Sequence, residues 1–276
     1  MKEFPVFIPR GDEHLSAVIA VPDSGPRGLV LLQPGGGGAP HSHRTAMYTK
    51  IARGLADRGI ASVRLDWKGV GDSTGTVAYS FKALPIADAV AVGQFAMDVV
   101  GTHVFGMAGN CGGARIALGS IPQIPETRSA VLIMVKPLAG PATSRDALRK
   151  TKLLLKRMRH VGPVARKAYW AARWRKASPI LESIRLVSGM SDLLLLEANT
   201  MKAGKLLAFV HGLQRSNGHQ RLEIEELPGG TTRGFHSLER QDVVITRTVD
   251  WFDQTFPGGS RRPAEAPRPP GQTARR

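Results

Sequence analysis

Residues 104–118 constrain the fold of this chain more than any other stretch. A short apolar run, typical of a strand buried on both faces, is followed by Gly109-Asn110-Cys111-Gly112-Gly113 and then by helix-favouring sequence rich in Ala, Ile and Leu. Glycines two residues before and after Cys111 permit a sharp strand-to-helix turn, because side chains there would collide. The pattern predicts a nucleophile elbow that lifts the Cys111 sulfur clear of the sheet. The alternative is a buried structural cysteine at a strand end.

Strand-like and helix-like segments alternate on both sides of this stretch. The first two expected strands, 3–8 and 15–21, resemble an antiparallel hairpin at a sheet edge. Further strands are predicted over 28–32, 60–66, 129–135, 183–188 and 220–227, and further helices over 44–58, 85–99, 197–215 and 238–256. This alternation indicates the α/β class, with a mostly parallel central sheet and helices on both faces. In such sheets the ligand site lies at the carboxyl ends of the strands, where Asp66 is expected together with the elbow.

A reactive thiol needs a base, and the base needs a carboxylate that orients it. On an elbow of this kind the order along the chain is nucleophile, acid, histidine. This order selects Asp192, which follows the predicted strand 183–188, and His236, which lies between the last strand and the last helix. Glu197 is the reserve candidate for the acid, because Asp192 also suits a turn or a helix N-cap. His236 could equally be an ordinary loop histidine.

Attack on a carbonyl also needs backbone N–H groups that hold the oxyanion. Gly112 supplies one at the start of the elbow helix. Because Pro34 has no N–H, the second is expected from Gly35, Gly36 or Gly37, although four glycines in a row could instead form only a flexible loop.

The residues expected to contact substrate are Gly37, His43, Trp67 and Trp170. His41 and His43 could alternatively cap the helix that follows them. One cysteine and scattered histidines show no metal-ligand spacing, so we expect neither a metal nor another cofactor.

The elbow and the element order resemble the α/β-hydrolase superfamily over residues 1–256. Within it, four stretches resemble the exosortase-associated hydrolases: Ser42-His43-Arg44, Ala52-Arg53-x-Leu55-Ala56-x-x-Gly59, the run from Val63-Arg64-Leu65-Asp66 to Gly75, and Ser188-Gly189-x-x-Asp192-Leu193. That resemblance implies a cysteine elbow and a Cys-His-Asp triad. The family's histidine motif is usually Asp-His-Thr-Phe, whereas here His236 follows Phe235. Dienelactone hydrolases and polyhydroxyalkanoate synthases also use a cysteine elbow, but their flanking sequences are less similar.

A cysteine nucleophile changes the expected chemistry, because the acyl-enzyme is a thioester that can pass its acyl group to an alcohol, an amine, a thiol or water. We therefore predict an acyltransferase or thioesterase that acts through acyl-Cys111 on a thioester or ester, with acyl-CoA or an acylated carrier protein as donor. One alternative is an esterase or lactonase that acts on a small carboxylic ester. Another is a catalytically silent member of the fold that binds a small molecule or scaffolds a complex.

The net charge of +16 is concentrated in two segments. Residues 144–176 carry twelve Lys and Arg against Asp146 alone, and 257–276 carry five Arg against Glu265 alone. We expect an α/β-hydrolase core over 1–140 and 178–256, a basic helical lid over 141–177 and a disordered Pro/Arg-rich tail over 257–276. The lid would dock an acyl carrier protein, CoA phosphates or an anionic membrane surface, unless it is only a solvated face.

No nucleic-acid recognition module accompanies this charge, so we expect no nucleic-acid partner. The N-terminus lacks a signal-peptide layout, and the single cysteine excludes an internal disulfide; both favour a cytoplasmic location.

Overall fold

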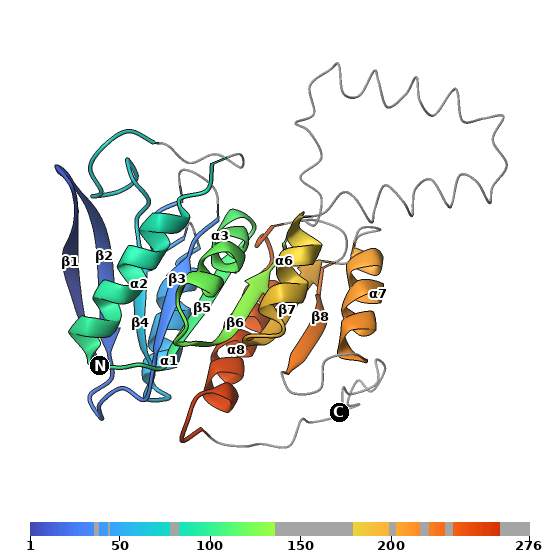
Figure 1. Ribbon diagram of the computed structural model, residues 1–276. Coiled ribbons are helices and arrows are strands. Elements are labelled where there is room, and N and C mark those ends of the chain that lie inside the picture. Colours follow the sequence, from blue (N-terminus) through green and yellow to red (C-terminus); the bar gives the residue numbers. More distant parts are fainter. Residues whose placement is uncertain are drawn as a thin grey trace, which may run out of the picture.

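The computed structural model describes residues 1–35, 39–43, 45–77, 83–135, 179–198, 203–215, 221–229 and 234–259. Within these residues one eight-stranded sheet forms the centre of the molecule (Figure 1). Its strands are β1 (Lys2–Arg10), β2 (Glu13–Val21), β3 (Leu29–Gln33), β4 (Ala61–Leu65), β5 (Phe105–Asn110), β6 (Thr127–Ile133), β7 (Asp192–Ala198) and β8 (Leu222–Leu227). They lie in the order β1-β2-β4-β3-β5-β6-β7-β8.

The sheet is parallel except at one end. β1 and β2 form an antiparallel hairpin, and β2 is also antiparallel to β4. The six strands from β3 to β8 are parallel to one another. Their carboxyl ends therefore lie at one common end of the sheet. The predicted edge hairpin and the mostly parallel sheet are both confirmed.

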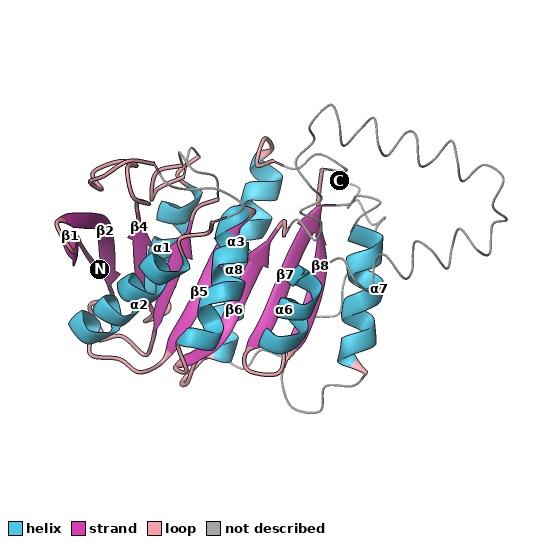
Figure 2. Ribbon diagram, turned by 45° about the horizontal axis from the view of Figure 1, so that its top comes forward, coloured by secondary structure: helices cyan, strands magenta, loops and turns pink. Residues whose placement is uncertain are grey.

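Helices cover both faces of the sheet (Figures 1 and 2). The described helices are α1 (Met47–Ala56), α2 (Ile86–Val100), α3 (Gly112–Ser120), α6 (Pro179–Val187), α7 (Ala203–Gln214) and α8 (Leu238–Thr255), with a 3₁₀ turn η1 (Ile121–Gln123) after α3. Helices α2, α3, α6 and α7 share one apolar core with the sheet, while α1 and α8 share the other. The predicted helical cover on both faces is therefore confirmed.

The central strands are buried on both faces because helices cover both. Every residue of β3, β4 and β5 is buried. Full burial of one Leu or Val side chain contributes about 1.5–3 kcal/mol, so these short strands hold the elbow on a rigid base.

One region of the chain differs from the sequence prediction. The predicted strand 183–188 is part of helix α6, whose buried Ile180, Ile184 and Val187 recur at helical spacing. The strand lies further along, over β7, whose four consecutive leucines are buried. The predicted helix over 197–215 accordingly begins later, at Ala203. The periodicity of a short apolar run does not distinguish a strand from a buried helix, which explains why the segment of α6 was predicted to be a strand.

The predicted basic lid over 141–177 lies outside the described residues, as do residues 260–276 of the predicted tail. In the part of the chain that is described, no helix has the length and apolar character needed to cross a membrane.

Candidate active site

Cys111 occupies a sharp turn between β5 and α3. Its backbone has φ 52° and ψ −103°, a conformation that a non-glycine residue adopts at a cost of about 1–3 kcal/mol. A Cβ at Gly109 would lie 2.5 Å from the Gly113 carbonyl carbon, and one at Gly113 would overlap the Gln33 carbonyl. The two glycines are therefore required by close backbone approach, as the sequence pattern predicts. Cys111 is a partly exposed residue, which does not fit a buried structural cysteine.

Gly35, two residues after the end of β3, lies beside this turn. The Gly35 N–H donates to the Asn110 side-chain oxygen at 2.7 Å, and a Cβ at Gly35 would collide with the Asn110 carbonyl. The prediction that Gly35 serves as an oxyanion donor is therefore wrong, because its one N–H is already used. Gly36 and Gly37 lie outside the described residues. Gly112 begins α3, where the first N–H groups have no acceptor within the helix and can face a ligand.

Trp67 holds Pro34, the residue before Gly35. Its indole N–H donates to the Pro34 carbonyl at 3.1 Å, and its side chain is 1% exposed within the apolar core. The prediction that Trp67 contacts substrate is wrong, because a large side chain that follows a buried strand is drawn into the core. Trp170, the other tryptophan predicted to contact substrate, lies outside the described residues.

A tyrosine that the sequence analysis missed lies against the elbow. Tyr48, on α1, is fully buried, and its hydroxyl lies 2.9 Å from the Asn110 side-chain oxygen and 3.0 Å from the Gln33 carbonyl oxygen. Burial raises the pKa of the Tyr48 phenol far above its usual range. Tyr48 therefore remains a neutral hydrogen-bond donor next to the nucleophile.

His236 lies between β8 and α8, as the triad order requires. The side chain is exposed and its ring is folded against Gly234, where a Cβ would collide with it. Among the described residues, no hydrogen bond joins His236 to Cys111 and no ion pair joins it to Glu197. Ser237, not His236, caps α8 by accepting from the Arg240 N–H.

His43 lies in this neighbourhood as well. Its ring packs edge-on against Phe235 at 5.3 Å and Tyr48 at 6.0 Å between centroids. His43 therefore lies between Phe235, which precedes His236, and Tyr48, which contacts Asn110 of the elbow. Helix α1 begins at Met47, and its N-cap is Ala46 without a side-chain cap, so neither His41 nor His43 caps the helix.

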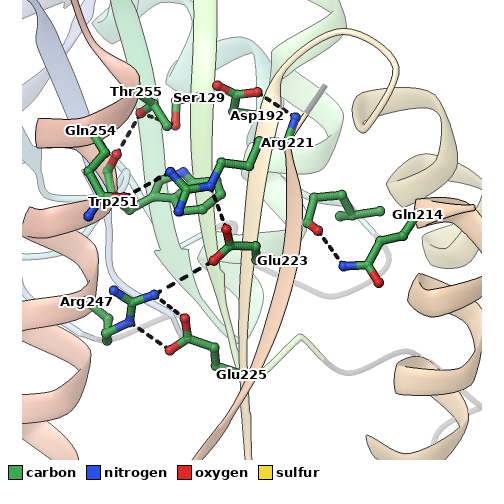
Figure 3. A network of polar contacts seen from close by, with 11 residues as sticks. Ser129, Asp192, Gln214, Arg221, Glu223, Glu225, Arg247, Trp251, Gln254 and Thr255 are labelled. Atoms are coloured by element: carbon green, nitrogen blue, oxygen red, sulfur yellow. Dashed lines mark hydrogen bonds and ion pairs between the residues drawn. The ribbon is translucent and has the colours of Figure 1, made fainter. Parts of the chain in front are cut away.

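Asp192 lies at the wrong end of its strand to act as the triad acid. It begins β7 and pairs with Ser129, whereas the elbow follows the opposite ends of β5 and β6. Its carboxylate accepts a hydrogen bond from the Arg221 backbone N–H at 2.8 Å (Figure 3). Burial raises the pKa of Asp192, and the hydrogen bond from Arg221 opposes part of that rise. The assignment of Asp192 to the triad is therefore wrong.

Glu197, the reserve candidate for the triad acid, lies near the carboxyl end of β7, at the same end of the parallel strands as Cys111. It is five residues further along β7, which at the rise of a strand is about 16 Å from Asp192. Its neighbour Leu196 is opposite Ile133, whose carbonyl accepts the Cys111 N–H at 2.9 Å. Glu197 is therefore level with the nucleophile, and it is 2% exposed.

An imidazole–carboxylate pair, His41 and Asp66, is present at the same end of the parallel strands. Asp66 follows β4 and is 1% exposed; its carboxylate accepts the His41 backbone N–H at 2.6 Å and lies 3.1 Å from His41 Nδ1. The sequence places Asp66 at this edge but does not reveal its partner. The available signal was that Asp66 directly follows β4 and that His41 lies in the segment between β3 and α1. No group of three His, Cys, Asp or Glu side chains in the described residues could hold a metal ion.

Comparison with known proteins identifies the fold. Neither a family model nor a curated relative matches the sequence. An α/β serine hydrolase without a lid from Xanthomonas campestris is 12% identical, with a TM-score of 0.60, over 94% of this chain and 97% of its own. An esterase from Pyrococcus furiosus is 15% identical, with a TM-score of 0.64, over 92% of each chain. A dienelactone hydrolase from Anabaena variabilis is 15% identical, with a TM-score of 0.56, over 92% of this chain and 98% of its own.

These similarities, with the strand order and the elbow, establish that the chain has the α/β-hydrolase fold. At such low identity they establish the fold alone. The predicted closer relation to the exosortase-associated hydrolases remains a prediction.

Proposed function

We propose that this chain is an enzyme that transfers or hydrolyses acyl groups through an acyl-thioester intermediate on Cys111. The observation that carries the proposal is the strained elbow. A partly exposed cysteine, held at φ 52° by two close glycine contacts at the start of a helix, is arranged to present sulfur to a carbonyl carbon. Strain of this kind persists only where the surrounding structure enforces it.

The reaction would proceed in two steps. An imidazole takes the Cys111 proton, the thiolate forms a bond to the carbonyl carbon, and the Gly112 N–H helps to hold the oxyanion. The oxyanion then expels the thiol or alcohol of the donor, which receives the proton from the imidazolium. In the second step the imidazole deprotonates water or an acceptor nucleophile, whose attack releases the acyl product. The Cys111 thiolate leaves and recovers its proton from the imidazolium.

We assign the base to His236 and its orienting carboxylate to Glu197. His236 lies in the loop after β8 that the triad order requires, and Glu197 lies level with the elbow on β7. The assignment requires the His236 ring to contact the Cys111 sulfur in the substrate complex, and such contacts often tighten only when substrate binds. His43 is the second candidate for the base because its ring packs on Tyr48.

A thioester is the preferred donor, because exchange of one thioester for another is nearly isoenergetic. Acyl-CoA or an acylated carrier protein fits this chemistry, and the basic segment 144–176 would attract the phosphates or acidic surface of either donor. The structural neighbours named as an esterase and a dienelactone hydrolase support the alternative of a small ester or lactone substrate.

The decisive experiment is intact mass spectrometry after exposure to butyryl-CoA or p-nitrophenyl butyrate. Because Cys111 is the sole cysteine, a mass gain that hydroxylamine removes and that is lost in Cys111→Ala assigns the acyl group to this sulfur. Acylation by butyryl-CoA supports the thioester hypothesis, and acylation by the ester alone supports the esterase hypothesis. No acylation by either donor would favour a catalytically silent binding protein.

The base is identified by the pH profile of Cys111 alkylation with iodoacetamide. We expect His236→Ala to shift the profile toward the behaviour of an ordinary thiol, with a loss near neutral pH. His211→Ala is the matched control, because His211 is an exposed histidine on α7 bonded to Gln214. If His43→Ala produces the shift and His236→Ala does not, the base is His43.

A further inference from the structure

A buried arginine, Arg240, lies in the first turn of α8 and contacts the chain at two points between β8 and α8. Its Nε donates to the Pro228 carbonyl at 2.6 Å, and its Nη1 donates to the Gly234 carbonyl at 2.9 Å. Pro228 directly follows β8, whereas Gly234 lies two residues before His236. One planar side chain therefore holds the chain where it leaves the sheet and where it approaches the proposed base.

Two glycines allow these close contacts. Gly229 has φ 87°, and a Cβ added there would lie 3.0 Å from Arg240 Nη2, so a side chain would meet both an unfavourable backbone conformation and the guanidinium. At Gly234 a Cβ would lie 2.4 Å from His236 Nε2, so the imidazole ring packs directly on the α-carbon. The ring of the proposed base therefore lies against the residue whose carbonyl Arg240 holds.

Gln241, the next residue of α8, holds Phe235, which directly precedes His236. Its side-chain amide donates to the Phe235 carbonyl at 2.7 Å, and Gln241 is 6% exposed. The Phe235 ring packs edge-on against His43, at 5.3 Å between centroids. Both candidate bases, His236 and His43, are therefore joined to the segment that α8 holds.

An arginine is unusual at this position of a helix. The start of a helix carries a partial positive charge, which favours acidic side chains there, and burial of a guanidinium removes it from water. Arg240 nevertheless lies in the first turn and is 2% exposed. Residues that break local preferences in this way are expected where function requires a particular geometry. Here the guanidinium supplies several directed N–H donors from one rigid group.

We propose that Arg240 is a positioning residue for the general base, with Gln241 as its support. The two side chains hold the segment before α8 so that the imidazole of His236 keeps one position relative to the Cys111 elbow. This inference rests on the proposed function, because the position of the imidazole matters when it takes the proton from the sulfur. Loss of Arg240 leaves the imidazole chemically intact but releases the segment that carries it.

The pH profile of Cys111 alkylation by iodoacetamide separates this role from a purely structural one. At neutral pH the reaction depends on the base, whereas well above the ordinary thiol pKa of about 8.5 the thiol ionises unaided. We expect Arg240→Met to lower the alkylation rate about tenfold at neutral pH and to leave the rate at high pH within about twofold of wild type. Arg240→Lys, which keeps one charged donor, should restore part of the lost rate.

A double variant tests whether Arg240 acts through the imidazole. If it does, Arg240→Met added to His236→Ala should cause no further loss at neutral pH, because the group that it positions is already absent. Losses that multiply would overturn the positioning role. Should His43 prove to be the base, the double variant is made with His43→Ala, because Phe235 joins His43 to the same segment.

The matched control is Arg247→Met, which makes the same replacement about two turns further along α8. Arg247 also joins α8 to β8, through a hydrogen bond to the Glu225 carboxylate at 2.7 Å. This variant should lower the free energy of unfolding without changing the shape of the pH profile. Should Arg240→Met fail to fold, Gln241→Met, which removes the hydrogen bond to Phe235, carries the test with a loss of about threefold.

The outcomes separate the inference from the proposed function. If an imidazole activates the wild-type thiol and the profile of Arg240→Met is unchanged, the inference alone is overturned. An equal loss at every pH would assign Arg240 to the fold and not to the base, which also overturns it. A wild-type profile of an ordinary thiol, altered neither by His236→Ala nor by His43→Ala, would overturn the proposed function and the inference with it.

Discussion

The Asp192 carboxylate accepts a hydrogen bond from the Arg221 backbone N–H at 2.8 Å, at the opposite end of the parallel strands from Cys111. This bond joins the start of β7 to the residue before β8 and is part of a polar network that includes Glu223, Glu225 and Arg247 (Figure 3). Asp192 is therefore a structural residue, and it lies at the opposite end of the parallel strands from Cys111.

We predict that Asp192→Asn leaves acylation unchanged and alters the dependence of stability on pH. Burial raises the pKa of Asp192 in the folded state, so the folded protein binds this proton more tightly than the unfolded chain does. Its contribution to stability is therefore complete below the unfolded pKa of about 3.9 and falls as the pH rises through the folded pKa.

The measurement is urea denaturation of both proteins across the acid range. The amide introduced by Asp192→Asn keeps an acceptor for Arg221 without a charge, so the stability of the variant relative to wild type should increase with pH. A difference that is flat, or that decreases with pH, contradicts the assignment.

Glu197→Gln is the companion variant at the other end of the same strand. If Glu197 orients His236, the substitution should lower the acylation rate by at least about tenfold at neutral pH, because the imidazole loses a charged partner. The measurement is acylation by p-nitrophenyl butyrate, with Asp192→Asn as the control. Equal rates in both variants would remove Glu197 from the site.

Trp67→Phe tests the buried hydrogen bond to the Pro34 carbonyl. Trp251 is a matched control: it is also 1% exposed, but its indole N–H has no hydrogen-bond partner among the described residues. Both replacements remove similar volume, while only Trp67→Phe leaves the Pro34 carbonyl without its donor. We expect Trp67→Phe to cost about 1–3 kcal/mol more than Trp251→Phe in the free energy of unfolding. Equal costs would show that Trp67 stabilises by packing alone.

Gly113→Ala tests the crowding at the elbow. A Cβ at this position would overlap the Gln33 carbonyl, which cannot move without displacing β3, so we expect a loss of more than about 3 kcal/mol or failure to fold. Gly212→Ala is the control, because Gly212 lies in α7 with nothing within 4 Å of the added Cβ. That variant should gain about 0.5–1 kcal/mol from helix propensity. Thermal unfolding of both proteins provides the comparison, and a mild effect at Gly113 would contradict the elbow geometry.

The amino-acid sequence by itself determined the elbow and the fold class. Gly109 and Gly113, two residues on either side of Cys111, predict a sharp strand-to-helix turn. The long alternation of apolar strands with helices predicts a mostly parallel sheet. Both signals are local or periodic, so they are readable without knowledge of distant contacts.

Only the tertiary structure decided which side chains meet at the site. The apolar run after Asp192 becomes β7 because it packs between β6 and β8, and this register places Glu197, not Asp192, level with Cys111. Likewise Gly35 donates to Asn110 and Trp67 to Pro34, although no sequence spacing indicates either pair. The physical reason is that side-chain partners are set by strand register and layer packing, which bring together residues that are far apart in the chain.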